Sequence, residues 1–232
     1  MSETRGDLLI RLADKIESEH GMDKKSITVM GHKPVGKCIP YGEIYHMTIP
    51  LNVGKEEILV TVPGYSPDSF EKMSDIIISQ LDILKPHYAS IMMICWNDEV
   101  KTMTKDIDYD AHELIRIELA KCLNIVLDKM EVKECSILGK SAGGGVTTHL
   151  AATRDNVHKV FLVCPGTNNV GKPLESKDFP IKIMWNKDDN KLPYSTVYGF
   201  LEEFDRQKKK YTFYSYNEGG HEIHPEFIKE LF

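Results

Sequence analysis

The chain has 232 residues, of which 41% are hydrophobic. That length provides one sizeable core and is too short for two ordinary domains joined by a linker. We therefore expect a single domain over residues 1–232, with residues 1–41 as a less well explained amino-terminal extension. The net charge of −6 argues against nucleic acid as a main partner, because phosphate binding needs a basic face.

No run approaches the roughly 18 apolar residues that a membrane span needs. The first residues are charged where a secretion signal would be apolar, so we expect a cytoplasmic protein without a membrane span. The five cysteines are odd in number and lack metal-ligand spacing, which favours reduced thiols in the core over disulfides. They are Cys38, Cys95, Cys122, Cys135 and Cys164.

Apolar periodicity switches repeatedly between helix and strand along the chain. In chain order, the pattern predicts a helix at 7–19, strands at 26–30, 43–49 and 58–62, a helix from Pro67 that ends before Pro86, a strand at 90–96, a helix at 109–130, strands at 135–138, 159–163 and 181–185, a helix at 198–204, a strand at 211–216 and a closing helix at 225–232. Helix-compatible residues also follow the glycine-rich turn at 139–145 and continue to Ala152. This alternation predicts the α/β class, with a mostly parallel sheet of about eight strands covered by helices on both faces.

The segment Gly139-Lys140-Ser141-Ala142-Gly143 lies between a buried strand and a helix. A nucleophile elbow needs this arrangement, because the serine occupies a strained turn whose neighbours must lack bulk. Ser141 would then lie at a helix amino end, where free N–H groups favour negative charge. The N–H of Ala142 is therefore a candidate donor to an oxyanion.

Two other interpretations of this segment compete with the nucleophile elbow. A phosphate-binding loop would need glycine at position 134, which is Glu134, and the residues between are an apolar strand. The other interpretation is a glycine-rich turn that only packs against its sheet. The nucleophile interpretation is favoured by the strand and helix that flank the turn.

A serine nucleophile needs a histidine base and a carboxylate that orients it. His221 follows the last predicted strand in a glycine-containing loop, and we expect it to be the base. The strand at 181–185 runs into a polar loop that contains Asp188 and Asp189. The residues alone leave both aspartates open as the acid.

Together these features resemble the α/β-hydrolase superfamily, from about Ile44 to the end of the chain. Aligning Pro193 with the proline of the family's acid loop selects Asp189, although Asn186 stands where the family often has glycine and leaves Asp188 as an alternative. The resemblance also implies a second oxyanion donor, the N–H of Tyr65, in the loop after the third strand, with Ser66 as the alternative.

The resemblance also makes a missing feature informative. Many members of this family insert a helical lid before the acid strand, whereas only residues 164–179 separate the two strands here. We expect an open site with a polar rim at 165–173, suited to small or exposed groups. Lys140 is interpreted as a lysine whose stem packs while its ammonium reaches solvent. The alternative is that its charge raises the positive potential near the oxyanion or favours an acidic substrate.

The predicted function is a serine hydrolase that cleaves a small or exposed carboxylic ester or thioester through an acyl-enzyme on Ser141. The alternatives are an exopeptidase or amidase of the same fold, and a non-catalytic binding protein that keeps the fold. The expected partner is a small-molecule ester, thioester or amide, and we expect no cofactor and no metal. The sequence does not specify the substrate or the oligomeric state.

Overall fold

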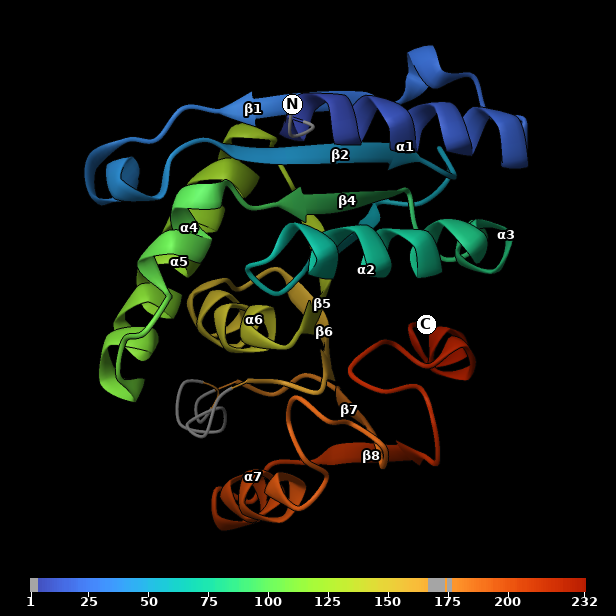
Figure 1. Cartoon of the computed structure of the whole chain (residues 1–232). Coiled ribbons are helices and arrows are strands. Elements are labelled where there is room, and N and C mark those ends of the chain that lie inside the picture. The colour runs from blue at the N-terminus through green and yellow to red at the C-terminus, as the bar shows by residue number, and fades with distance from the viewer. Residues whose placement is uncertain (1–3, 167–173, 175–176) are drawn as a thin grey trace.

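The computed structural model describes residues 4–166, 174 and 177–232. Eight strands form one sheet in the order β1-β2-β4-β3-β5-β6-β7-β8 (Figure 1). β2 is antiparallel to its neighbours β1 and β4, and the remaining neighbours are parallel. The strands are β1 Thr28–His32, β2 Ile44–Pro50, β3 Glu57–Val62, β4 Ser90–Cys95, β5 Glu134–Lys140, β6 Val157–Val163, β7 Ile181–Asn186 and β8 Tyr211–Tyr216.

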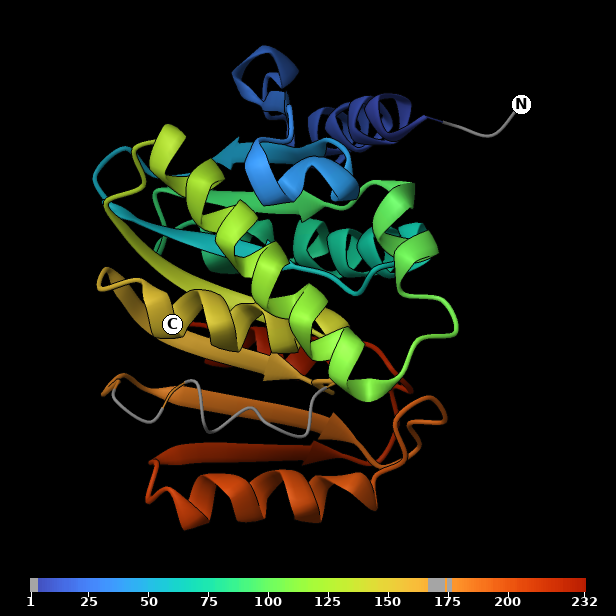
Figure 2. The same ribbon diagram turned by 90° about the vertical axis from the view of Figure 1, so that its left-hand side faces the viewer.

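Helices cover both faces of the sheet. The α-helices are α1 Arg5–His20, α2 Pro67–Ser79, α3 Leu81–Leu84, α4 Asp98–Met103, α5 Tyr109–Lys129, α6 Ala142–Thr153 and α7 Thr196–Arg206. Short 3₁₀ helices are η1 Lys24–Ser26, η2 Gly36–Tyr41 and η4 Pro225–Glu230. Helices α5, α6 and α7 lie on one face, and α1, α2, α3 and η4 lie on the other (Figures 1 and 2). This arrangement confirms the predicted α/β class and mostly parallel sheet.

The central strands are buried on both sides, which explains their nearly continuous apolar sequence. In β5, every residue from Cys135 to Lys140 is buried, and in β6 the same holds from Val160 to Val163. The edge strand β8 instead has a half-buried pattern. Because β3 to β8 are parallel, their carboxyl ends meet along one rim of the sheet. Ligand sites of such folds lie at that rim.

The amino-terminal segment packs against this sheet. β1 pairs with β2 from Thr28 to His32, and Thr4 caps α1 through a reciprocal capping box with Asp7. Ion pairs join α1 to α2, with Arg11 lying 2.8 Å from Glu71 and Lys15 lying 2.6 Å from Asp75. The predicted strand at 26–30 is shifted by two residues, because Ser26 ends the η1 turn.

The expectation of reduced cysteines is wrong for two of the five. Cys38 in η2 and Cys122 in α5 form a disulfide across 84 residues of sequence, while Cys95, Cys135 and Cys164 are buried free thiols. The pairing depends on how η2 folds onto α5. The spacing of the cysteines in the sequence does not indicate that tertiary contact.

Local structure departs from the predicted helices in three places. The predicted helix from Pro67 divides at Gln80, whose φ of −118° is not helical, into α2 and α3. The closing segment forms the 3₁₀ helix η4 instead of an α-helix. Helix α4 was not predicted, because it has six residues and buries only Val100, which gives no periodic pattern.

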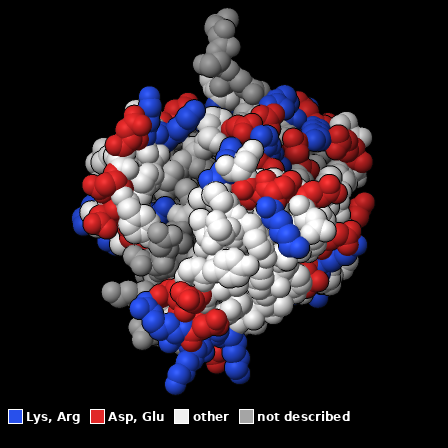
Figure 3. All heavy atoms as spheres, turned by 60° about the horizontal axis from the view of Figure 1, so that its bottom comes forward, with Lys and Arg blue, Asp and Glu red and all other residues white. Residues whose placement is uncertain are grey.

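The surface carries charged side chains of both signs, as the numbers of acidic and basic residues in the sequence indicate. Acidic and basic side chains are interspersed around the face seen in Figure 3, with a broad uncharged area between them. Among the described residues, no helix has the length and apolar character needed to cross a bilayer.

Candidate active site

Ser141 lies in a sharp turn where β5 ends and α6 begins. Its φ of 54° and ψ of −129° fall outside the regions that L-residues favour, so the backbone is strained at this serine. The strain is held by hydrogen bonds from Ser141 N–H to the Val163 carbonyl, at 2.9 Å, and from Gly166 N–H to the Ser141 carbonyl, at 2.8 Å. This strand–turn–helix geometry is that of a nucleophile elbow.

The two glycines of the turn are required by close packing. A Cβ on Gly143 would lie 2.2 Å from the Val62 carbonyl oxygen and 2.4 Å from that of Pro63. A Cβ on Gly139 would lie 2.3 Å from Thr147 Oγ1. A side chain at Gly143 would therefore push the turn away from the loop after β3, and a side chain at Gly139 would push it away from α6.

Two backbone N–H groups are available beside Ser141. Ala142 is the first residue of α6, so its N–H has no acceptor within the helix. Tyr65 follows β3 in the adjoining loop, and among the described residues nothing accepts a hydrogen bond from its N–H. Trp96 Nε1 anchors this loop by donating to the Pro63 carbonyl, at 3.0 Å. Tyr65 and Ala142 line the pocket that contains Ser141.

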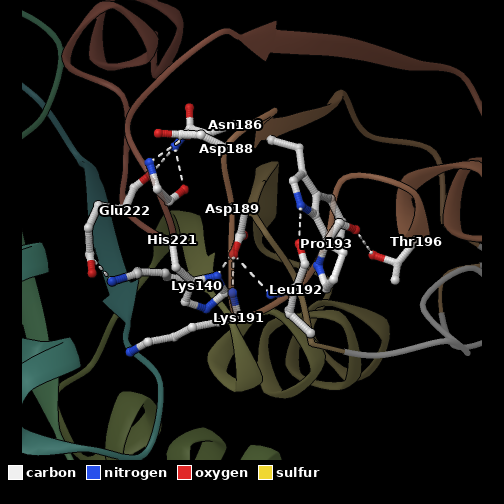
Figure 4. Close-up of polar contacts among 12 residues, drawn as sticks. Lys140, Asn186, Asp188, Asp189, Lys191, Leu192, Pro193, Thr196, His221 and Glu222 are labelled. Atoms are coloured by element: carbon white, nitrogen blue, oxygen red, sulfur yellow. Dashed lines mark hydrogen bonds and ion pairs between the residues drawn. The ribbon is translucent and has the colours of Figure 1, made fainter.

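His221 and Asp189 are paired beneath the same pocket. Nδ1 of His221 lies 2.7 Å from Oδ2 of Asp189, and both side chains are buried (Figure 4). Oδ1 of Asp189 accepts from the N–H groups of Lys191 and Leu192, each at 2.9 Å. Burial disfavours the Asp189 carboxylate, but the hydrogen bonds from His221 and Leu192 outweigh it and lower the pKa of Asp189.

Asp188 has a different environment. Its carboxylate accepts from the N–H groups of Gly219 and Gly220, at 3.2 and 2.8 Å, and so holds the loop that carries His221. The residue that contacts the histidine ring is Asp189. Of the two aspartates left open by the sequence, the geometry places only Asp189 in contact with the imidazole.

Asn186 stands where the family often has glycine, and its side chain bonds the loop that carries His221. Its side-chain amide donates to the carbonyls of Gly220 and Glu222, at 2.9 and 2.8 Å (Figure 4). A Cβ on Gly219 would lie 2.7 Å from the same amide nitrogen, which explains why glycine occupies that position. The loop around His221 is therefore fixed from both Asn186 and Asp188.

The interpretation of Lys140 as a snorkelling lysine is wrong. Its side chain is 1% exposed and its ammonium forms an ion pair with Glu222, the residue after His221 (Figure 4). Burial lowers the pKa of Lys140, and the Glu222 carboxylate opposes that shift. Because sequence spacing does not reveal a contact across 82 residues, only the fold shows that Lys140 ties the elbow to the histidine loop.

Ser141 and His221 line one pocket with a volume of about 320 Å³. No hydrogen bond joins the Ser141 hydroxyl to the His221 ring among the described residues. Catalytic hydrogen bonds are often long before substrate binds, so this geometry is compatible with a nucleophile and its base. The pocket also contains Tyr65, His112 and Arg116, of which the sequence indicated only Tyr65.

One group of side chains has the composition of a metal site. Cys164 Sγ, an Asp189 oxygen and a His221 nitrogen lie within 4.8 Å of one another, and all three residues are buried. Asp189 and His221 already bond each other, and burial together with the nearby Asp189 carboxylate raises the pKa of the Cys164 thiol. A protonated thiol is a poor metal ligand and a poor nucleophile, so this group fits neither role well.

The predicted polar rim at 165–173 lies largely outside the described residues, as does most of the connection between β6 and β7. The open, lidless site therefore stays a prediction.

The sheet order, the single antiparallel strand β2 and the elbow at Ser141 define the α/β-hydrolase fold. No family model matches the sequence, and no curated protein matches it. Solved structures do match, and those described below are hydrolases of this fold.

Est1E from Butyrivibrio proteoclasticus superposes with a TM-score of 0.62 and 14% identity, covering 87% of this chain and 94% of that one. An alpha-beta serine hydrolase homologue from Coxiella burnetii gives a TM-score of 0.59 and 16% identity, covering 88% and 93%. A serine hydrolase without a lid from Xanthomonas campestris gives 0.57 and 13%, covering 84% and 86%. At these identities the likeness establishes the α/β-hydrolase fold.

Proposed function

We propose that the protein is a serine hydrolase that cleaves a small or exposed carboxylic ester or thioester through an acyl-enzyme on Ser141. The observation that supports this most strongly is the strained Ser141 at the amino end of α6, in one pocket with His221, whose ring bonds Asp189. The solved structures of the same fold described as serine hydrolases support it as well.

In the proposed mechanism, His221 takes the proton of the Ser141 hydroxyl as the oxygen attacks the substrate carbonyl. Asp189 bonds Nδ1 of the ring, which leaves Nε2 as the proton acceptor and stabilises the imidazolium. The N–H groups of Ala142 and Tyr65 receive the oxyanion. His221 then protonates the leaving alcohol or thiol, and water releases the acyl group by the same route in reverse.

The alternatives are an exopeptidase or amidase and a non-catalytic binding protein. The same site would attack an amide as well as an ester, so the kinetic comparison below distinguishes the two. The burial and bonding of Asp189 and His221 favour catalysis over binding alone, because a binding protein does not need an oriented imidazole beside a strained serine.

Turnover of an activated short-chain ester tests the proposal. The wild type should release the chromophore, and Ser141→Ala should lose at least about a thousandfold of that activity, the order expected when a triad nucleophile is removed. Full activity in Ser141→Ala would contradict the assignment. Faster hydrolysis of an aminoacyl anilide than of the ester would favour the amidase alternative.

We also propose that residues 1–232 form one domain, which the pairing of β1 with β2 and the ion pairs between α1 and α2 support.

The cytoplasmic location is part of the same proposal. The Cys38–Cys122 disulfide weighs against it, since disulfides are rare in reducing compartments.

A further inference from the structure

Three buried polar atoms that have no hydrogen-bond partner among the described residues belong to residues that line the proposed catalytic pocket. They are Tyr65 Oη, His112 Nδ1 and Arg116 Nε. Arg116 is 6% exposed and Tyr65 is 8% exposed, so neither group is satisfied by bulk solvent. Buried polar atoms are nearly always hydrogen-bonded, and three in one pocket point to a missing ligand.

The position of Arg116 is fixed by its neighbours, and its buried Nε has no hydrogen-bond partner among the described residues. Its Nη1 donates to Oε2 of Glu113 at 3.0 Å, and the guanidinium carbon lies 5.7 Å from the centre of the Tyr109 ring. Oε1 of Glu113 lies 2.7 Å from Nε2 of His149, on the helix that begins at Ser141. Both Glu113 oxygens are thus occupied, and neither is left to accept from Nε of Arg116, a residue that lines the pocket.

The chemistry of these atoms selects a ligand that accepts hydrogen bonds. An arginine Nε–H only donates. Burial raises the pKa of Tyr65 against the opposing effect of the nearby Arg116, so the Tyr65 hydroxyl stays protonated and donates as well. Burial and the Arg116 charge lower the pKa of His112, so its ring is neutral near pH 7 and adds a third polar contact. His112 and Arg116 are one turn apart on α5 and therefore share a face.

The charge of the pocket favours an anionic acceptor. The basic side chains that line it are Arg116, Lys140 and Lys191, whereas only Asp68 and Glu222 are acidic. Glu222 pairs with Lys140, and Asp68 lies 3.1 Å from Lys72. The charges of Lys140 and Glu222 therefore cancel within the pocket, and Arg116 pairs with Glu113, which does not line it. The lining keeps one more basic than acidic side chain, and a carboxylate matches this small excess and the donor arrangement.

We propose that Arg116, Tyr65 and His112 form a subsite that binds a carboxylate of the substrate, so that the ester cleaved at Ser141 is itself a carboxylic acid. The inference rests on the proposed function for its catalytic part. The carboxylate lies on the acyl or the alcohol side of the scissile bond, within the span of one pocket of about 320 Å³.

Two pairs of esters test both placements. The acyl pair is para-nitrophenyl hydrogen adipate and para-nitrophenyl methyl adipate, and the alcohol pair is meta-carboxyphenyl acetate and phenyl acetate. The wild type should prefer the carboxylate member of at least one pair by about 10-fold or more in kcat/KM, the size expected for hydrogen bonds to a charged group. No preference in either pair would overturn the proposal. That result is expected if water alone bonds these three atoms.

Two variants assign the preference to these residues. Tyr65→Phe removes only the unpartnered hydroxyl and should reduce the preference about threefold or more, by raising KM for the carboxylate ester. Arg116→Gln combined with Glu113→Gln removes both charges together and should bring the preference close to one. Lys121→Gln, on the exposed side of α5, is the matched control and should keep the preference. Retention of the preference in both subsite variants would overturn the assignment.

A binding measurement separates this proposal from the proposed function. Ser141→Ala should bind monomethyl adipate or meta-hydroxybenzoate in calorimetry, and addition of Arg116→Gln and Glu113→Gln should weaken that binding at least about 10-fold. If no ester is hydrolysed, the proposed function fails, while such binding would still support the subsite. Absence of binding to both carboxylates would overturn the subsite.

Discussion

At the scale of single residues, the site depends on which carboxylate contacts the histidine. Asp189 bonds the His221 ring, while Asp188 bonds the backbone of the loop before it. The two aspartates are adjacent in sequence but have separate tasks in the proposed mechanism. One orients the base directly, and the other fixes the loop on which the base stands.

Replacing each aspartate by asparagine should therefore give unequal effects. Asp189→Asn removes the charge that stabilises the imidazolium and should lower kcat by about 10³- to 10⁴-fold, as observed for other triads. Asp188→Asn keeps an acceptor for the loop N–H groups and should cost less than about 10-fold. Ester kinetics of the two variants would show this, and equal losses would contradict the assignment of Asp189.

The lowered pKa of Asp189 also gives a sign for the pH dependence of stability. Its carboxylate is favoured in the folded state, so its contribution is complete above the ordinary value of 3.8 and is lost as pH falls through the lowered folded pKa. Denaturant unfolding of wild type and Asp189→Asn should give free energies that converge below about pH 4. A gap that widens with acid would contradict the shift.

At the scale of elements, the contact between the turn at Ser141 and the loop after β3 brings the proposed nucleophile and the proposed oxyanion donors together. Gly143 permits that contact, because its α-carbon faces the carbonyls of Val62 and Pro63. A flexible side chain can move aside, whereas two backbone carbonyls cannot. The separation of these two loops is therefore set by the glycine.

Gly143→Ala should lower the unfolding free energy by about 3 kcal/mol or more and abolish ester hydrolysis, because overpacking here displaces backbone. Gly199→Ala is the matched control: Gly199 lies in α7 with open space around its α-carbon, and the change should stabilise by up to about 1 kcal/mol. Thermal unfolding of the two variants provides the comparison. A fully stable and active Gly143→Ala variant would contradict the packing argument.

Local pattern explains which elements were predicted. The strand before Ser141 and the long helix α5 are marked by continuous or periodic apolar residues. The break at Gln80, the short helix α4 and the 3₁₀ turn at Pro225 leave no such mark, since a few residues with one buried side chain resemble a loop. Periodicity reports long amphipathic elements and misses short ones.

At the scale of the whole molecule, the features that sequence reasoning missed are contacts between distant segments. Lys140 meets Glu222, Arg116 joins the pocket from α5, and Cys38 meets Cys122. The order of Ser141, an aspartate and His221 was readable because it follows the strand ends of a known type of fold. The partners of Lys140 and Arg116 depend on how the helices and loops pack against the sheet. A local sequence pattern does not specify that packing.

The disulfide joins η2 to the helix that carries Arg116. By restricting an unfolded loop of 84 residues, it should contribute about 2–4 kcal/mol to stability. Reductant should therefore lower the Tm of the wild type by roughly 5–15 °C. The variant with serine at both positions should melt at the reduced temperature and ignore reductant. An equal response of both proteins to reductant would contradict a structural role for this bond.

The central claim, that Ser141 is an activated nucleophile, is tested most directly by a fluorophosphonate followed by peptide mass spectrometry. The account predicts one covalent adduct, located on Ser141, which disappears in Ser141→Ala and forms more slowly in His221→Ala. A wild-type protein that stays unlabelled, or an adduct on another residue that survives in Ser141→Ala, would contradict it.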